Sequence, residues 1–347
     1  MAKNKLSLIN KLFLLLNNVF AIALIVSFFI PKLSPEEYGI FALLSLVTPA
    51  LIVINVAFVL YWTFIGFKKQ LTLSFFVLLL SYLFIPSVYK FYNNSSKNTK
   101  NSLSVMTYNV RKFNIYKWIK EKHIDSIIDN FITKENPDIV TLQEYGNYEN
   151  FKLDYPYYYH HISYNYYKKT YIKSGLVTYS KYPIINKGSL SITKFSSTII
   201  YIDIVKKKDT IRIYNFHFKS LGVVPNEDFF GHKDSEKLIK RLSGSFKTQQ
   251  KQIDTLNAHV ALCKYKVILA GDMNNTAYSW AYKNVKNDLQ DSFLEVGKGF
   301  GKTYEFKKFP LRIDYIFADK SMKFTKHKTF NKKYSDHYPI SAIIELK

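Results

Sequence analysis

Three long apolar runs dominate the first 90 residues of the chain. The first covers residues 12–30 and holds only three polar side chains, and the other two cover 40–64 and 71–89. No charged residue occurs within any of them. At a rise of about 1.5 Å per residue, a helix of each length reaches across a hydrocarbon layer of about 30 Å. The pattern predicts three transmembrane helices, which together form a membrane anchor over residues 1–92.

Two other interpretations compete for these apolar runs: a cleaved signal sequence and the buried helices of a soluble protein. The tripeptide Pro31-Lys32-Leu33 after the first run offers no small-residue cleavage site, and two more runs follow it. Only short polar segments separate the runs, which is typical of membrane hairpins. An anchor that stays in the membrane is therefore favoured.

Basic residues in the short loops predict the orientation of this anchor. Three lysines precede the first run, and Lys68 and Lys69 lie between the second and the third. Because cytoplasmic loops are enriched in Lys and Arg, both segments are expected in the cytoplasm, whereas the loop with Lys32, Glu36 and Glu37 faces outward. Three crossings of the cell (inner) membrane then place the rest of the chain in an extracytoplasmic or periplasmic position.

After a polar linker at 93–102, strand-like and helix-like segments alternate over residues 103–347, which predicts a layered α/β domain. The segment 104–109 is β-rich, and apolar residues recur at helical spacing between 124 and 132. Further strands are expected near 139–142, 157–166, 175–180, 198–205, 210–218 and 267–270, with a long helix over 235–263.

The positive net charge of the chain gives only a partial indication of its partners. The chain has a formal net charge of +23, most of it beyond residue 100. A positive domain attracts phosphate-rich partners such as nucleic acids or anionic lipid head groups, although lysines spread over a solvated surface give the same composition. The single Cys263 cannot form an internal disulfide, so cysteine usage leaves the compartment open.

Polar side chains that suit catalysis follow the apolar strands at five places. These are 107–109, Gln143-Glu144, 215–217, 271–274, and the late pair 312–316 with 335–337. Loops at strand ends are where sheet proteins collect side chains into a site. Each place alone is weak, since a terminal Asn or Glu is more often a turn or a cap.

In order and spacing, these five segments resemble the motifs of the endonuclease/exonuclease/phosphatase superfamily. The segments 174–184, 288–293 and 299–304 also look like family motifs, so the resemblance covers residues 101–347. Val110, Phe218 and Met273 depart from common family residues without removing a functional group. The resemblance implies an α+β fold, a four-layer α/β/β/α sandwich, here preceded by the three transmembrane α-helices.

The resemblance also implies a metal site and a set of catalytic residues. Asn109, Glu144 and Asp336 would supply oxygen ligands to Mg²⁺ or Mn²⁺, with Glu144 as the principal ligand. One cysteine and no paired His spacing argue against zinc. The remaining set is expected to be catalytic: His217, Asp272, Asn274, Asp314 and His337.

Each catalytic residue has an implied role in hydrolysis of a phosphate ester. Asp272 would orient or deprotonate the attacking water, and Asn274 would hold the water or a phosphate oxygen. His217 and His337 would contact the scissile phosphate, while Asp314 would orient one of these imidazoles, with His337 favoured. The other histidines, His327 among them, are expected to be structural or on the surface.

The expected function is metal-dependent phosphoester hydrolysis by in-line attack of an activated water, as a phosphodiesterase or nuclease. One alternative is a phosphatase or phospholipase-like hydrolase of inositol or sphingolipid head groups, and another is a catalytically silent, membrane-tethered binding module. The expected partners are the membrane and a nucleic acid or phospholipid head group, with no obligate protein partner evident. The Asn-x-His setting of His217 resembles the branch with pancreatic deoxyribonuclease, sphingomyelinases and inositol phosphatases.

Overall fold

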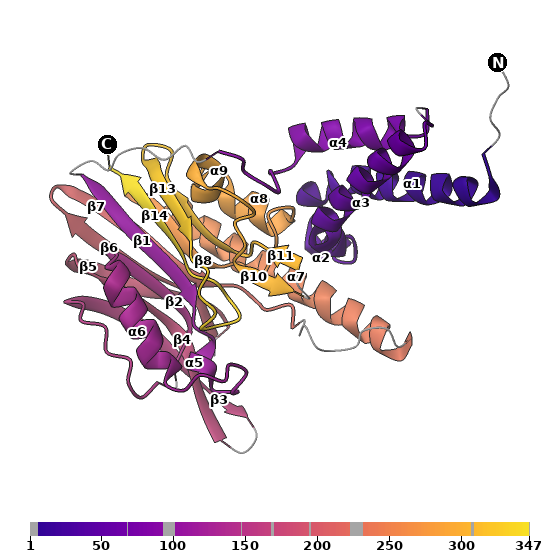
Figure 1. The fold of residues 1–347 in the computed structure, drawn as a ribbon. Helices are drawn as coiled ribbons and strands as arrows, with labels where there is room; N and C mark the ends of the chain where they lie inside the picture. The colour runs from indigo at the N-terminus through magenta and orange to yellow at the C-terminus, as the bar shows by residue number, and fades with distance from the viewer. Residues whose placement is uncertain are drawn as a thin grey trace.

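The structure is a computed structural model that describes residues 6–67, 69–92, 101–146, 148–167, 170–193, 196–222, 232–306 and 309–346. A layered domain built around two sheets carries a group of apolar helices on one side (Figure 1). The two ends of the domain lie together, since Asn101 and Leu346 exchange hydrogen bonds of 2.8 and 2.9 Å. Lys68 and residues 93–100 of the expected linker lie outside the described residues, so those predictions stay predictions.

Two six-stranded sheets form the centre of the domain, in the orders β13-β14-β1-β2-β4-β3 and β5-β6-β7-β8-β12-β9. The pairs β1/β2 and β7/β8 are parallel, whereas β12 runs antiparallel to β8. The strands of the first sheet are β1 (Ser102–Asn109), β2 (Ile139–Tyr145), β3 (Tyr157–Tyr167), β4 (Thr170–Ser180), β13 (Lys323–Thr329) and β14 (Ile340–Glu345). Those of the second are β5 (Ile184–Thr193), β6 (Ser196–Lys206), β7 (Asp209–His217), β8 (Lys266–Asp272), β9 (Gln290–Asp291) and β12 (Asp314–Ala318), and β10 (Tyr304–Phe306) pairs with β11 (Phe309–Leu311) as a separate hairpin.

The alternation of side chains along the strands builds the core. In β1, Leu103 and Val105 point between the sheets, whereas Met106 and Tyr108 belong to the outer core of the first sheet. Successive residues of a strand face opposite sides, so both faces of this strand are apolar and both must be covered. Ile213 and its neighbours in the second sheet meet β1 from the other side.

Helices cover the outer faces of both sheets. α6 (Ile124–Glu135) packs Ile128 and Ile132 on the first sheet, and α7 (His232–Ala261) packs Ile253 and Leu256 on the second, beside α8 (Trp280–Lys286). Two short elements, α5 (Arg111–Asn114) and α9 (Ser292–Val296), complete the domain. The predicted α/β/β/α sandwich is confirmed.

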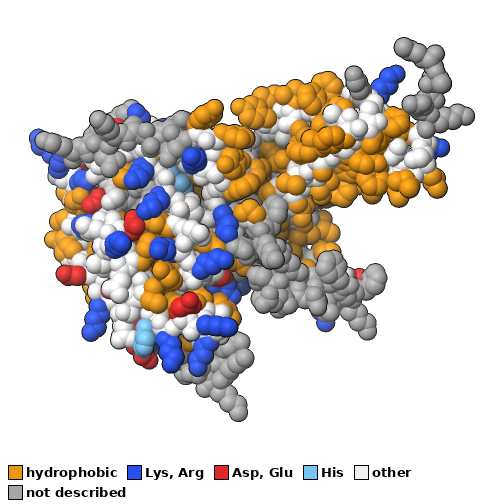
Figure 2. Space-filling model, viewed as in Figure 1, with side chains coloured by type: hydrophobic (Ala, Val, Ile, Leu, Met, Phe, Trp, Pro, Cys, Tyr) orange, Lys and Arg blue, Asp and Glu red, His pale blue; other side chains and the backbone are white. Residues whose placement is uncertain are grey.

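The N-terminal segment folds into a small helical bundle. Its elements are α1 (Leu8–Ser27), η1 (Ile30–Lys32), α2 (Pro35–Tyr38), η2 (Phe41–Leu43), α3 (Leu44–Phe64) and α4 (Thr72–Phe84). Apolar side chains cover the surface of this bundle, while Lys and Arg are concentrated on the layered domain (Figure 2). The side chains of Leu15, Val53 and Leu83, for example, have exposed fractions of 60%, 57% and 68%. An apolar exterior of this kind suits a lipid environment.

Polar side chains lie inside the bundle. Asn17, Asn55 and Ser74 are fully buried, one from each long helix. The Ser74 hydroxyl lies 2.8 Å from Asn55 Oδ1 and 3.1 Å from Asn17 Oδ1, and Trp62 Nε1 donates to Asn17 Oδ1 over 3.1 Å. Buried hydrogen bonds between helices whose outside is apolar are typical of membrane bundles.

Among the described residues, two helical segments, not three, are long and apolar enough to cross a membrane: Leu8–Lys32 and Phe41–Phe64. The predicted third span at 71–89 is wrong in its extent, because α4 has only 13 residues and measures about 20 Å. It stops at Phe84, since Pro86 lacks an N–H group and keeps the preceding Ile85 extended, at φ −124° and ψ 152°.

Candidate active site

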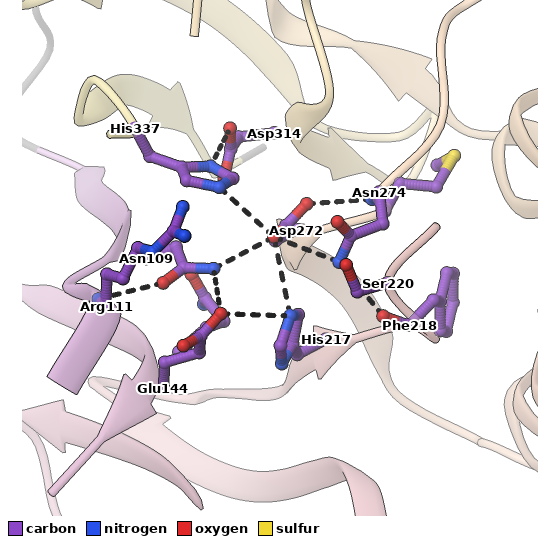
Figure 3. A network of polar contacts seen from close by, with 12 residues as sticks. Asn109, Arg111, Glu144, His217, Phe218, Ser220, Asp272, Asn274, Asp314 and His337 are labelled. Atoms are coloured by element: carbon purple, nitrogen blue, oxygen red, sulfur yellow. Dashed lines mark hydrogen bonds and ion pairs between the residues drawn. The ribbon is translucent and has the colours of Figure 1, made fainter. Parts of the chain in front are cut away.

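The ends of the central strands bring the polar segments together. Asn109 ends β1, His217 ends β7 and Asp272 ends β8. The antiparallel strand β12 begins beside them with Asp314, directly opposite Asp272. Because the two sheets face each other, residues from both meet at one edge of the sandwich, around the carboxylate of Asp272 (Figure 3).

Asp272 lies at the centre of the network and is fully buried. Its Oδ2 accepts from Asn109 Nδ2 over 3.0 Å and lies 3.5 Å from His217 Nε2 and 3.8 Å from His337 Nε2. A buried carboxylate requires such partners, because an isolated charge away from water is strongly unfavourable. Asp272 is therefore held in place by two imidazoles and by neighbouring amides.

Asn274 completes the turn after β8. Its backbone N–H donates to Asp272 Oδ1 over 2.8 Å, and its side-chain amide donates to Phe218 O and Asp272 Oδ2 over 3.0 and 3.2 Å. The residue has a φ of +52°, in the left-handed region that Asn tolerates better than most residues. This conformation keeps the amide of Asn274 beside the carboxylate.

His337 and Asp314 form a buried pair. Both oxygens of Asp314 lie close to His337 Nδ1, at 3.0 and 3.2 Å. Burial alone would lower the pKa of His337, but the carboxylates of Asp314, Asp272 and Glu144 raise it to about 9. His337 is therefore a cation at neutral pH, with Nε2 directed to Asp272. The expectation that Asp314 pairs with His337 agrees with this contact.

Glu144 lies on the opposite side of Asp272. Burial would raise its pKa, but His217, Lys112 and Arg111, with a contribution from His337, lower it below its usual range. Its Oε1 lies 3.9 Å from His217 Nε2 and 3.4 Å from Asn109 Nδ2. Within the described chain, His217 Nε2 is buried and makes no hydrogen bond. Glu144 is thus a charged carboxylate beside an imidazole nitrogen that makes no hydrogen bond among the described residues.

Asp336 is connected to the network through Arg111. Its carboxylate forms an ion pair with the guanidinium of Arg111, whose backbone N–H donates to Asn109 Oδ1 over 3.0 Å. The Asn109 amide thus turns its nitrogen, not its oxygen, toward Glu144. All eight residues of the predicted site belong to one network, but their roles as metal ligands and catalytic residues stay predictions.

The sequence did not reveal the cationic segment α5. Arg111, Lys112, Phe113 and Asn114 all have positive φ, so this turn is left-handed. Such a turn is unfavourable by about 1–2 kcal/mol per residue for side chains of this kind. It places Lys112 Nζ 3.5 Å from Glu144, and the Arg111 guanidinium stacks 3.5 Å above the ring of Trp118. A Lys-Arg pair after a strand carries no motif that would predict this role.

Two further supporting residues lie below the site. Gln143 donates to Asn215 Oδ1 over 2.8 Å, and Asn215 donates to backbone carbonyls of Leu142 and Val177 over 3.1 and 2.8 Å. All these groups are buried, so the bonds join the first sheet to the second directly beneath the active residues. Gln143 precedes Glu144 directly, and Asn215 lies two positions before His217, which was the available signal for this role.

Comparisons with known proteins agree with this geometry. Residues 106–337 match the Endonuclease/Exonuclease/phosphatase family, and residues 10–88 match a Domain of unknown function (DUF8431). The matched segment covers more than half of the chain, which therefore belongs to the endonuclease/exonuclease/phosphatase family. A comparison with curated proteins finds no match.

Solved structures show the same fold at low sequence identity. An endonuclease/exonuclease/phosphatase from Bacteroides vulgatus is 16% identical, with a TM-score of 0.53 over 72% of this chain and 100% of its own. A humanized TDP2 of D. rerio and a mannosyl-6-phosphatase of Bacteroides thetaiotaomicron are each 16% identical with TM-scores of 0.50. The first covers 71% of this chain and the second 70%, and each match includes 99% of the other chain. Family members are phosphoester hydrolases, so this chain has the fold and family of such enzymes.

Proposed function

We propose that the protein is a membrane-bound, divalent-metal-dependent phosphodiester hydrolase that works by in-line attack of water. The buried carboxylate of Asp272, enclosed by two imidazoles and two amides, is the observation that carries this proposal. Such a group accepts a proton from water, while the surrounding donors face the charge that develops on a phosphate ester.

The residues around Glu144 fit a hard divalent cation. Glu144 keeps its charge because nearby cations lower its pKa, and His217 Nε2 beside it has no hydrogen-bond partner among the described residues. Carboxylate and amide oxygens suit Mg²⁺ or Mn²⁺. Glu144 would hold the ion together with Asn109 and Asp336. When bound, the ion neutralises phosphate charge and stabilises the leaving oxyanion.

A second acidic group is also close enough to hold a cation. Ligand atoms of Asp272, Asp314 and His337 lie within 4.8 Å of one another. The Asp314 carboxylate is already occupied by His337 Nδ1 on both oxygens, and His337 is protonated at neutral pH. Because His337 Nδ1 engages both oxygens of Asp314, we assign this group to orientation of the imidazole and to proton transfer.

The chain's own residues account for the proton transfers. Asp272 orients the attacking water and accepts its proton, and Asn274 fixes the Asp272 carboxylate and offers an amide to the water or a phosphate oxygen. His337, a cation held by Asp314, donates from Nε2 to the phosphate, and His217 faces the same space. The alternative of a silent binding module would require loss of one of these groups, and all of them are present.

The bundle supports an extracytoplasmic domain. The segment between α1 and α3 contacts α7, so it lies on the same side as the catalytic domain: Ser34 Oγ and the Glu36 N–H lie 3.0 and 2.9 Å from Gln250 Oε1. The chain leaves α3 on the other side of the membrane, and it would return to the domain through α4, which measures about 20 Å, together with the residues after α4. Lys69 lies in the loop between α3 and α4, and because cytoplasmic loops are enriched in Lys and Arg, it supports a domain outside the cytoplasm.

Two functions fit this site: a nuclease, and a phosphatase or phospholipase-like hydrolase of inositol or sphingolipid head groups. The substrate distinguishes them. We propose a phosphodiester, either nucleic acid or phospholipid head group, because the domain is basic and close to the membrane. The test is hydrolysis by the full chain in detergent with Mg²⁺ or Mn²⁺, on plasmid DNA, RNA, sphingomyelin and an inositol phosphate, with His337→Ala as control. Cleavage of one class that vanishes in the control assigns the substrate, and inactivity on all of them contradicts the proposal.

A further inference from the structure

The membrane bundle is attached to the catalytic domain at several places. In the first, the segment between α1 and α3 lies against the middle of α7, where Gln250 Oε1 accepts from Ser34 Oγ and the Glu36 N–H over 3.0 and 2.9 Å. In the second, Ala42 packs with Leu221, Leu242 and Phe246 in one buried apolar cluster. The segment that joins the two long helices is therefore part of the interface with the domain.

The third attachment lies where the chain leaves the bundle. Lys90 and Gly299 exchange backbone hydrogen bonds of 2.9 and 2.8 Å, and Lys90 Nζ donates to Leu294 O over 2.7 Å. An anchor held at both ends differs from a flexible tether, whose domain would reorient freely.

The start of α3 touches the turn that carries Asn274. The hydroxyl of Thr276 donates to the backbone carbonyl of Ser45 over 2.7 Å, and both residues are buried. Ser45 Oγ also lies 3.4 Å from Asn275 Oδ1. These contacts are two residues or fewer from Asn274, whose amide and backbone N–H hold Asp272.

Two consecutive glutamines of α7 contact the turn after β8 and the membrane bundle. Gln249 Nε2 donates to Lys219 O over 2.8 Å and lies 3.4 Å from the carbonyls of Met273 and Asn274, while its Oε1 accepts from Asn275 Nδ2 over 2.9 Å. Its neighbour Gln250 binds the bundle. The turn after β8 is therefore supported from α7 and from α3 together.

We propose that the bundle is a structural part of the active site, with Thr276 as a positioning residue that fixes the turn of Asn274 through Ser45. The inference rests on the proposed hydrolase function. Loss of the Thr276 hydroxyl loosens this turn and misplaces the water-holding groups, which lowers kcat and leaves KM nearly unchanged. A small misplacement of a catalytic group lowers rates up to about a hundredfold.

The kinetic test uses the full chain in detergent, with Mn²⁺ and bis(p-nitrophenyl) phosphate. Thr276→Val keeps the shape and removes the hydroxyl, and we expect a fall in kcat of about tenfold with KM within about twofold. Thr276→Ser returns the hydroxyl and is expected to restore kcat. Thr248→Val removes a similar hydroxyl from the exposed face of α7, where it bonds only its own helix, and serves as the control.

A second measurement tests docking without activity. In a Cys263→Ser background, we expect Ser34→Cys and Gln250→Cys to be joined by a short bifunctional thiol reagent in native membranes, whereas Ser34→Cys with Thr255→Cys is not. A missing cross-link, or a Thr276→Val enzyme with the kcat of Thr248→Val, overturns the inference. An efficient cross-link between Ser34→Cys and Gln250→Cys, together with a wild-type chain that hydrolyses no ester, leaves docking in place and contradicts the proposed function instead.

Discussion

The amide of Asn109 donates to the carboxylate of Asp272 over 3.0 Å, although 163 positions separate the two residues. Asn109 ends a strand of the first sheet and Asp272 ends a strand of the second. The bond therefore exists only when the two sheets are packed correctly. Since Asp272 also meets both histidines, the apolar core between the sheets sets the geometry of the whole site.

Removal of the charge of Glu144 is expected to weaken metal binding. Glu144→Gln keeps the size of the side chain but loses the carboxylate that hard cations prefer, so the affinity for Mn²⁺ should fall about a hundredfold. Calorimetric titration of the purified full chain measures this, and chelator should abolish hydrolysis by the wild type. Glu149→Gln, at an exposed position, is the control, and equal affinity in both variants would exclude Glu144 as a ligand.

Asp314 is expected to control the alkaline limit of activity. The pKa of His337 is about 9, so this imidazolium is present below that pH, and kcat/KM should fall as the pH rises through it. Asp314→Asn removes the charge that raises the pKa of His337 most. The alkaline limb of the pH profile of kcat/KM should therefore move to lower pH, and kcat should fall by about 10²–10⁴. The fully exposed Asp288→Asn should leave the profile unchanged. An unmoved limb in Asp314→Asn would show that His337 is not the titrating group.

His327 is expected to make stability depend on pH, although it lies outside the active site. Burial lowers its pKa to about 4 from 6.5, and Ser292 Oγ lies 3.0 Å from its Nδ1. Below pH 6.5 His327 is protonated in the unfolded chain but stays neutral in the folded chain until the pH approaches 4. Stability is therefore full above pH 6.5 and declines as the pH falls toward 4, by about 3 kcal/mol in all.

Unfolding by denaturant in detergent between pH 7 and pH 4 measures this dependence of stability on pH. His327→Gln should flatten the profile, and the exposed His123→Gln should not. The same slope in both variants would assign the pH dependence to other groups.

The orientation of the anchor is testable with single cysteines in the Cys263→Ser background. Glu37→Cys lies between α1 and α3, and Lys298→Cys lies on the catalytic domain beside Gly299. Both should react with a membrane-impermeant thiol reagent on intact cells, whereas Lys69→Cys should react only after permeabilisation. Opposite behaviour of positions 37 and 298 would contradict the contact between this segment and the domain.

Much of the fold was predictable because apolar residues recur at a clear period in several of its helices and strands. The helix 235–263 and the strands near 198–218 were expected almost as observed, since their apolar residues recur at a clear period. β5 is a half-exposed edge strand with few buried residues, so its pattern was weak. α4 was overestimated because composition shows how apolar a run is, but Pro86 decides where the helix stops.

The clustering of the site residues and the contact of Asp314 with His337 were predictable, whereas most of the other contacts were not. Strand ends and motif order identified Asp272, Asn274 and His337, because chemistry restricts which residue types occur there. The left-handed turn at Arg111 and the contact of Ser45 with Thr276 depend on tertiary packing between distant segments. Single-sequence patterns contain local information only, so neither feature left a signal in them.

The most direct test of the account is the hydrolysis of bis(p-nitrophenyl) phosphate by the full chain, with and without Mn²⁺, for the wild type and Asp272→Asn. Asp272→Asn removes the proposed base and keeps the size of the side chain. We predict metal-dependent turnover by the wild type and a loss of about 10³-fold in kcat for the variant, with folding unchanged by circular dichroism. Turnover by Asp272→Asn at the wild-type rate, or no metal-dependent turnover by the wild type, would contradict the account.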